Sequence, residues 1–124
     1  MMTRPFALVT GASSGIGYEL AAICAREGYD LLVAADRPEL QEAAEHFRTL
    51  GATVTAVQVD LATTDGVDRL WAAAGGRPID ALLANAGHGL GGAFLDQDFA
   101  AVRHVIDTNV TGTVYLVQKV GRAM

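Results

Sequence analysis

Short hydrophobic runs alternate with longer stretches of helical period along the chain. Four runs are rich in aliphatic or β-branched residues, and they cover residues 6–10, 30–35, 53–59 and 79–84. Continuous apolar runs of this length are typical of strands that are buried on both faces of a parallel sheet. Because one helix-length segment separates each run from the next, the alternation predicts parallel βαβ units.

Three of the intervening segments have an amphipathic helical pattern, and we expect the apolar face of each to pack on the sheet. The apolar positions are Ile16, Leu20, Ile23 and Cys24 in the first segment, Leu40, Ala43, Ala44, Phe47 and Leu50 in the second, and Val67, Leu70, Trp71 and Ala74 in the third. Each segment is followed by glycine, at Gly28, Gly51 and the pair 75–76. Glycine in this position favours the left-handed conformation that ends a helix.

The last part of the chain begins with a glycine-rich loop, 87–92, and continues as one helical pattern from about Asp98 to the final residue. Its predicted apolar stripe consists of Phe99, Val102, Ile106, Val110, Val114, Val117 and Val120. The pattern reaches the last residue without a cap or a polar tail, so we expect a longer protein to continue this helix.

Size and composition fit one folded domain over residues 1–124, or part of one. The chain has 124 residues, of which 51% are hydrophobic and 19% charged, and this balance excludes a disordered or fibrous chain. The net charge of -5 argues against nucleic acid and anionic membranes as partners. Cys24 is the only cysteine, and the apolar run 6–9 is too short for a signal peptide or a membrane span. We therefore expect a soluble cytoplasmic protein.

The segment 10–17, which reads TGASSGIG, connects the first predicted strand to the first predicted helix. Gly11 allows a tight turn, Gly15 lets the backbone approach a large anion, and Gly17 permits close packing of helix on strand. The free N–H groups of the helix start then face a pyrophosphate. The residues that we expect to contact a dinucleotide here are Gly11, Ser13, Ser14, Gly15, Ile16 and Gly17.

Asp36 and Arg37 follow the second predicted strand, at the position where such a turn is paired with a ribose-binding residue. A carboxylate accepts hydrogen bonds from the ribose hydroxyls and favours NAD, whereas a guanidinium holds a 2′-phosphate and favours NADP. We favour NAD, because Asp36 lies at the strand end and Ser14 adds no positive charge; NADP stays open. A solvated turn before Pro38 is the structural alternative.

Four features in register resemble the short-chain dehydrogenase/reductase family: the turn at 10–17, Val59-Asp60-Leu61, Asn85-Ala86-Gly87, and Asn109. Ala84 departs from the family pattern, which commonly has asparagine there. The resemblance implies that Asp60 and Leu61 contact adenine and that Asn85, Ala86 and Gly87 steady the sheet beside the cofactor. It also implies that Asn109 belongs to the catalytic tetrad, distorting its helix and extending a proton relay through water.

The resemblance implies an α/β fold of Rossmann type: a doubly wound parallel sheet, truncated to about four strands in the order 3-2-1-4, with helices on both faces. It places the catalytic serine and the Tyr-x-x-x-Lys pair in a second half that we expect to be missing here. Tyr115 and Lys119 have the Tyr-x-x-x-Lys spacing, but they follow Asn109 on the same helix with no intervening strand and serine. We therefore reject them as the catalytic pair.

Two classes of function follow. The chain is the NAD(P)-binding region of an oxidoreductase that transfers hydride between a nicotinamide cofactor and a carbonyl or alcohol, and it is inactive alone; or it is a non-catalytic module that binds a dinucleotide or docks on a protein. An edge at the fourth strand predicts a homo-oligomer, or pairing with another chain through that strand and the last helix.

The three histidines, His46, His88 and His104, lack metal-site spacing and are interpreted as surface or core residues.

Overall fold

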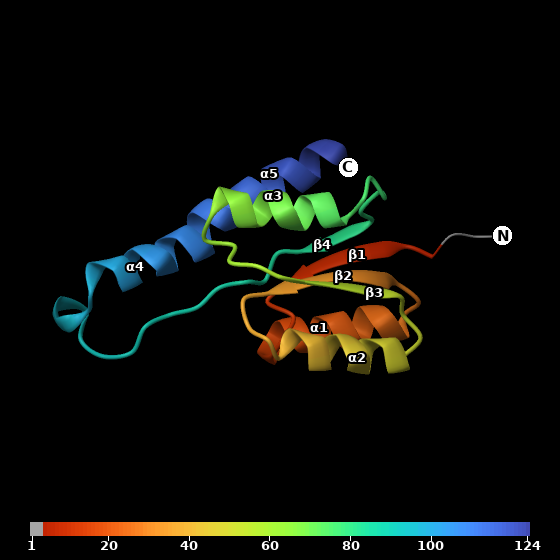
Figure 1. The fold of residues 1–124 in the computed structure, drawn as a ribbon, viewed down its shortest axis with the longest axis horizontal. Helices are drawn as coiled ribbons and strands as arrows, with labels where there is room; N and C mark the ends of the chain where they lie inside the picture. Colours follow the sequence, from red (N-terminus) through yellow and green to blue (C-terminus); the bar gives the residue numbers. More distant parts are fainter. Residues whose placement is uncertain (1–3) are drawn as a thin grey trace.

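The computed structural model describes residues 4–124, which form one parallel sheet flanked by helices (Figure 1). The strands are β1 (Phe6–Thr10), β2 (Asp30–Ala35), β3 (Val54–Gln58) and β4 (Ala81–Leu83). The α-helices are α1 (Gly15–Arg26), α2 (Leu40–Thr49), α3 (Thr64–Ala73), α4 (Phe99–Ile106) and α5 (Thr113–Ala123). A 3-10 turn (Phe94–Asp96) precedes α4, and a π-helical turn (Asp107–Gly112) joins α4 to α5.

The strand order β3-β2-β1-β4 confirms the predicted arrangement, and all three neighbouring pairs are parallel. β1 lies centrally, with Ala7 opposite both Leu31 of β2 and Ala81 of β4. Because every connection is a crossover, the carboxyl ends of all four strands meet at one edge of the sheet.

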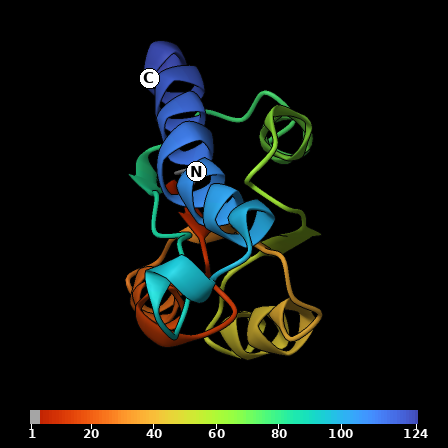
Figure 2. The same cartoon turned by 90° about the vertical axis from the view of Figure 1, so that its left-hand side faces the viewer.

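Helices cover both faces of the sheet, as predicted. Figures 1 and 2 show α1 and α2 on one face and α3 and α5 on the other. Alternate residues of β1 enter two different cores: Ala7 and Val9 pack toward α1 and α2, whereas Phe6 and Leu8 pack toward α3 and α5. Residues 6–9 of β1 are apolar because both faces of the strand are buried.

The predicted apolar face of α1 is wrong for two of its residues, Ile16 and Ile23. Ile16 and Ile23 are 73% and 51% exposed, and the helix instead buries Gly17 and three alanines. A Cβ added at Gly17 would collide with the Gly11 carbonyl. The helix lies so close to the sheet that only small side chains fit between them, so the large apolar residues are turned outward.

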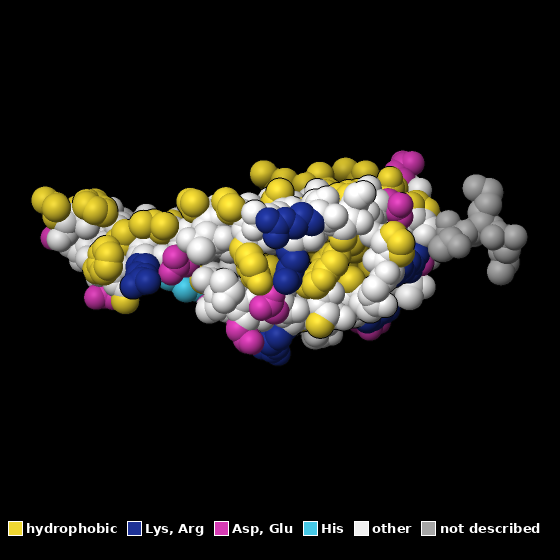
Figure 3. All heavy atoms as spheres, turned by 90° about the horizontal axis from the view of Figure 1, so that it is seen from above, with side chains coloured by type: hydrophobic (Ala, Val, Ile, Leu, Met, Phe, Trp, Pro, Cys, Tyr) yellow, Lys and Arg dark blue, Asp and Glu magenta, His cyan; other side chains and the backbone are white. Residues whose placement is uncertain are grey.

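The helical stretch predicted from about Asp98 to the end of the chain is confirmed over residues 99–123, but its predicted apolar stripe is wrong. The π-helical turn shifts the helical phase, and the side that faces the protein is formed by Thr108, Gly112, Leu116 and Val120. Of the predicted stripe only Val120 is fully buried. The other members include Phe99, Ile106, Val110, Val114 and Val117, all of which are exposed, and hydrophobic side chains gather over this part of the surface in Figure 3.

At the other end of the sheet, where the strands begin, the buried carboxylate of Asp30 links three separate segments of the chain. Asp30, at the start of β2, accepts hydrogen bonds from Arg4 Nε (2.9 Å), Arg77 Nη1 (3.2 Å) and the Thr53 N–H (3.1 Å). Burial alone would raise the pKa of Asp30, but these donors and the two positive charges lower it below its ordinary value. Asp30 therefore contributes stability as the ionised form.

Asp30→Asn should lower the free energy of unfolding at pH 7 by about 2 kcal/mol, because two guanidinium groups lose their charged acceptor. A group with a depressed folded pKa contributes fully above its unfolded pKa of about 3.9, and its contribution disappears as pH falls through the folded pKa. Urea unfolding at several pH values should show the gap to the unsubstituted chain narrowing below about pH 4. The exposed Asp96→Asn is the control; an equal gap for both variants would contradict the role of Asp30.

Candidate functional site

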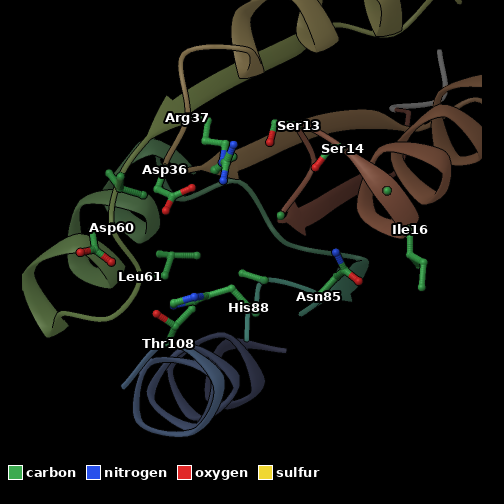
Figure 4. Close-up of a pocket in the computed structure, with 16 residues that line it drawn as sticks. Ser13, Ser14, Ile16, Asp36, Arg37, Asp60, Leu61, Asn85, His88 and Thr108 are labelled. Carbon is green, nitrogen blue, oxygen red and sulfur yellow. The ribbon is translucent and has the colours of Figure 1, made fainter. Parts of the chain in front are cut away.

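A cleft of about 540 Å³ opens at the carboxyl ends of the strands. The β1–α1 turn, the end of β2, the loops after β3 and β4, and the π-helical turn all contribute to its wall (Figure 4). The lining includes these predicted site residues: Gly11, Ser13, Ser14, Gly15, Ile16, Asp36, Arg37, Asp60, Leu61, Asn85, Ala86 and Gly87. Of the predicted set, Gly17 and Asn109 do not line the cleft.

The β1–α1 turn has the backbone that its glycines predict. Gly11 and Gly15 have positive φ angles of 67° and 59°, which side chains disfavour. Gly17 is buried, and a Cβ there would meet both the Gly11 carbonyl and the Asn85 side chain. Gly17 thus acts from behind the cleft by letting α1 begin directly beside the end of β1.

The N-terminus of α1 presents amide groups to the cleft. Ser14 precedes the helix without a side-chain capping bond, and the first turn has no acidic residue. The contrast is α3, whose first turn contains Asp65 and is capped by Thr63, which accepts from the Gly66 N–H at 2.9 Å. Uncapped amides at a helix start attract an anion.

Thr10 joins the turn to the loop after β4, a role that the sequence motif alone does not reveal. Its buried Oγ1 accepts hydrogen bonds from the N–H groups of Asn85 (3.0 Å) and Ala86 (2.9 Å). The Asn85 side chain in turn donates from Nδ2 to the Thr10 backbone carbonyl at 3.3 Å. The hydroxyl at the end of β1 thus fixes the start of the segment 85–87 to the sheet.

Asp36 and Arg37 stand directly after β2, and both are exposed at the cleft wall (Figure 4). The position therefore offers a carboxylate and a guanidinium to one ligand. The Asp36 carboxylate suits a ribose diol and the Arg37 guanidinium suits a 2′-phosphate, so the geometry alone does not select one of them.

His88 and His104, which the sequence indicates only as surface or core residues, form a group with Asp60; Asp60 and His88 line the cleft, and His104 contacts both. His104 Nε2 lies 3.1 Å from Asp60 Oδ2, and His104 Nδ1 lies 2.8 Å from His88 Nε2. Burial alone would raise the pKa of Asp60, but the Ala62 N–H and the two imidazoles lower it below its ordinary value. Sequence spacing could not find this group, since its members come from three separate segments.

Asn109 lies in the π-helical turn, which agrees with the local helix distortion that the resemblance implies. Its side chain holds the backbone of His88 at both ends: Oδ1 accepts from the His88 N–H and Nδ2 donates to the His88 carbonyl, each at 2.9 Å. Gly87 allows this approach, because a Cβ there would lie 2.9 Å from Asn109 Oδ1.

Thr108, also missed from sequence, has a buried hydroxyl at the cleft wall. Among residues 4–124 its Oγ1 is the only buried side-chain nitrogen or oxygen without a hydrogen-bond partner. Figure 4 shows this side chain on the side of the cleft that Leu61 and His88 also line. The Thr108 hydroxyl therefore has hydrogen-bonding capacity that the described residues leave unused.

Tyr115 and Lys119 lie outside the cleft lining. The Tyr115 hydroxyl donates to Asp68 Oδ1 at 2.7 Å, and Lys119 Nζ lies 3.1 Å from the same oxygen. This contact joins α5 to α3 on the surface.

No group of three or more His, Cys, Asp or Glu residues that could hold a metal ion occurs in the described part of the chain. No helix there is long and apolar enough to cross a membrane.

The family model described as short chain dehydrogenase matches residues 5–124. The chain belongs to this family. An uncharacterized oxidoreductase of Myxococcus xanthus is 41% identical over 116 residues, which cover 90% of this chain and 45% of that protein. The chain thus spans less than half the length of this curated relative.

Two solved structures share the fold and were determined with dinucleotides. The 3-oxoacyl-[acyl-carrier protein] reductase from Brucella melitensis in complex with NAD is 35% identical, with a TM-score of 0.81, over 100% of this chain and 50% of that one. The L-sorbose reductase from Gluconobacter frateurii complexed with NADPH and L-sorbose is 29% identical, with a TM-score of 0.88, over 99% and 48%. Members of the fold therefore include structures with either cofactor.

Thr10→Val should destabilise the chain by about 2 kcal/mol, because the isosteric side chain leaves two N–H groups of the loop after β4 without an acceptor. Thr10→Ser keeps the hydroxyl and loses one methyl group, so its cost should be smaller, about 1 kcal/mol. Chemical denaturation measures both. Equal losses for the two variants would show that the hydroxyl does not hold the loop.

Proposed function

We propose that the cleft binds the dinucleotide NAD(H) as the cofactor region of a short-chain oxidoreductase. The observation that carries the proposal is the uncapped start of α1, whose amides line the same cleft as Asp36 and Asp60. A dinucleotide combines a pyrophosphate with a ribose and a base, and the cleft offers one type of partner for each.

The residues present fit this cofactor. The amides of Gly15 and Ile16 hold the pyrophosphate, and the absence of acidic residues from the first turn of α1 leaves nothing there to repel it. Asp36 accepts from the adenosine ribose, and Asp60 and Leu61 bind adenine. The orphaned hydroxyl of Thr108 agrees with a polar ligand at this wall.

When bound, the nicotinamide supplies a hydride acceptor or donor for a carbonyl or alcohol substrate. Asn109 contributes indirectly, as the resemblance implies: it fixes the His88 backbone at the cleft and extends a proton relay. Tyr115 and Lys119 take no part, because their contacts with Asp68 hold them at the α3–α5 surface. Residues 4–124 would then supply the cofactor cleft.

Gly15→Ala should weaken NADH binding at least about tenfold, because its Cβ would stand before the amides of α1 at a residue with positive φ. Gly28→Ala is a matched control: Gly28 also has a positive φ (92°) and open space for a Cβ, but it lies at the other end of α1. Both variants should lose about 1 kcal/mol of stability. Titration calorimetry showing equal NADH affinity for the two would contradict the proposed phosphate site.

The chain should bind NAD⁺ more tightly than NADP⁺, because Asp36 accepts from the ribose diol and repels a 2′-phosphate. Asp36→Ala should reverse this order, with a change of about tenfold in the affinity ratio. Arg37→Ala should weaken NADP⁺ further and leave NAD⁺ unchanged. Titration of each variant with both dinucleotides tests this; tighter NADP⁺ binding by the unsubstituted chain would overturn the preference.

The partner surface proposed here is the edge of β4 together with the outer side of α4 and α5. β4 ends the sheet on one side, and Phe99 and Val114 are 71% and 61% exposed. Backbone groups at a sheet edge and clustered apolar side chains both favour association with another polypeptide, such as a second copy of this chain.

A further inference from the structure

Asp60 has an unusually well-defined carboxylate for an exposed residue. The Ala62 N–H donates to Oδ1 at 2.9 Å, and His104 Nε2 lies 3.2 Å from Oδ1 and 3.1 Å from Oδ2. The Asp60 side chain is nevertheless 48% exposed and lines the cleft. The carboxylate is thus oriented from behind while it stays accessible to a ligand.

An ionised carboxylate only accepts, so His104 donates to Asp60 from Nε2. On its other side, His104 Nδ1 lies 2.8 Å from His88 Nε2, and the direction of this hydrogen bond depends on the tautomers of the two rings. Asn109 fixes the His88 backbone beyond this contact. His104 is therefore held between Asp60 and His88 with a proton on Nε2.

We propose that His104 is a positioning residue that makes the cleft specific for adenine dinucleotides over their hypoxanthine analogues. This inference rests on the proposed function. With two donors at Oδ1 and one at Oδ2, the carboxylate keeps acceptor capacity at Oδ2 for the exocyclic amino group of adenine. Hypoxanthine carries a carbonyl oxygen at that position, which offers no proton and is repelled by the carboxylate.

His104 matters because orientation determines whether the remaining lone pair meets the amino group. Without His104, the carboxylate keeps only the Ala62 N–H at Oδ1, and Oδ2 turns toward water. The loss should affect the ligand that has the amino group and spare the ligand that lacks it. A residue that only stabilised the fold would change the affinity for both ligands equally.

The experiment compares NAD⁺ with nicotinamide hypoxanthine dinucleotide by titration calorimetry on the whole chain. The unsubstituted chain should bind NAD⁺ about tenfold more tightly than the analogue, because one charge-assisted hydrogen bond contributes about that factor to the affinity. His104→Ala should bring this ratio close to one by weakening NAD⁺ alone. His104→Gln should preserve most of the preference, because its amide can donate in place of Nε2.

His46→Ala is the matched control for loss of a histidine. His46 lies on α2, where its ring stacks on Tyr18 at 5.7 Å, and it is absent from the cleft lining. It should leave the ratio unchanged. Long-range ¹H–¹⁵N correlation of the unsubstituted chain provides a second measurement that needs no variant to fold: it should show His104 protonated at Nε2.

The possible failures separate the two proposals. If the unsubstituted chain binds neither dinucleotide, the proposed function is wrong, and the inference fails with it. If both dinucleotides bind with equal affinity, or if His104→Ala weakens both equally, the inference is overturned and the proposed function stands. His104 protonated only at Nδ1 would also overturn the inference.

Discussion

The close approach of α1 to the end of β1 is the constraint on which the site depends. Gly17 lies against the Gly11 carbonyl with no room for a side chain. That contact requires small residues along the inner face of α1, which explains why the helix buries alanines and exposes Ile16. It also places the uncapped amides of the helix at the edge of the sheet where the strands end.

A second close approach builds the opposite wall. A Cβ at Gly112 would collide with the Leu61 carbonyl, so the π-helical turn lies directly against the loop after β3. This contact brings Thr108 and Asn109 to the cleft, and Asn109 then fixes His88. The two glycine contacts therefore frame one cleft from opposite sides.

The sequence predicts the parts of this protein whose physical cause is local. The strand runs and the glycine turn were predicted because they rest on apolar periodicity and on backbone conformation in one segment, whereas the order of the sheet was predicted from the resemblance to the family. The faces of α1 and of the last helix were not, because helix-to-sheet distance, which the glycines set, overrides the position of the largest apolar residues. His104 and Thr108 escaped notice because their roles arise only when separate segments meet.

The most direct test of the account is an NMR titration of the chain with NAD⁺, following the backbone amides one by one. The largest shifts should occur at Gly15 and Ile16, where the pyrophosphate would meet the start of α1. Binding that leaves these two amides unperturbed while shifting resonances elsewhere would contradict the proposed phosphate site.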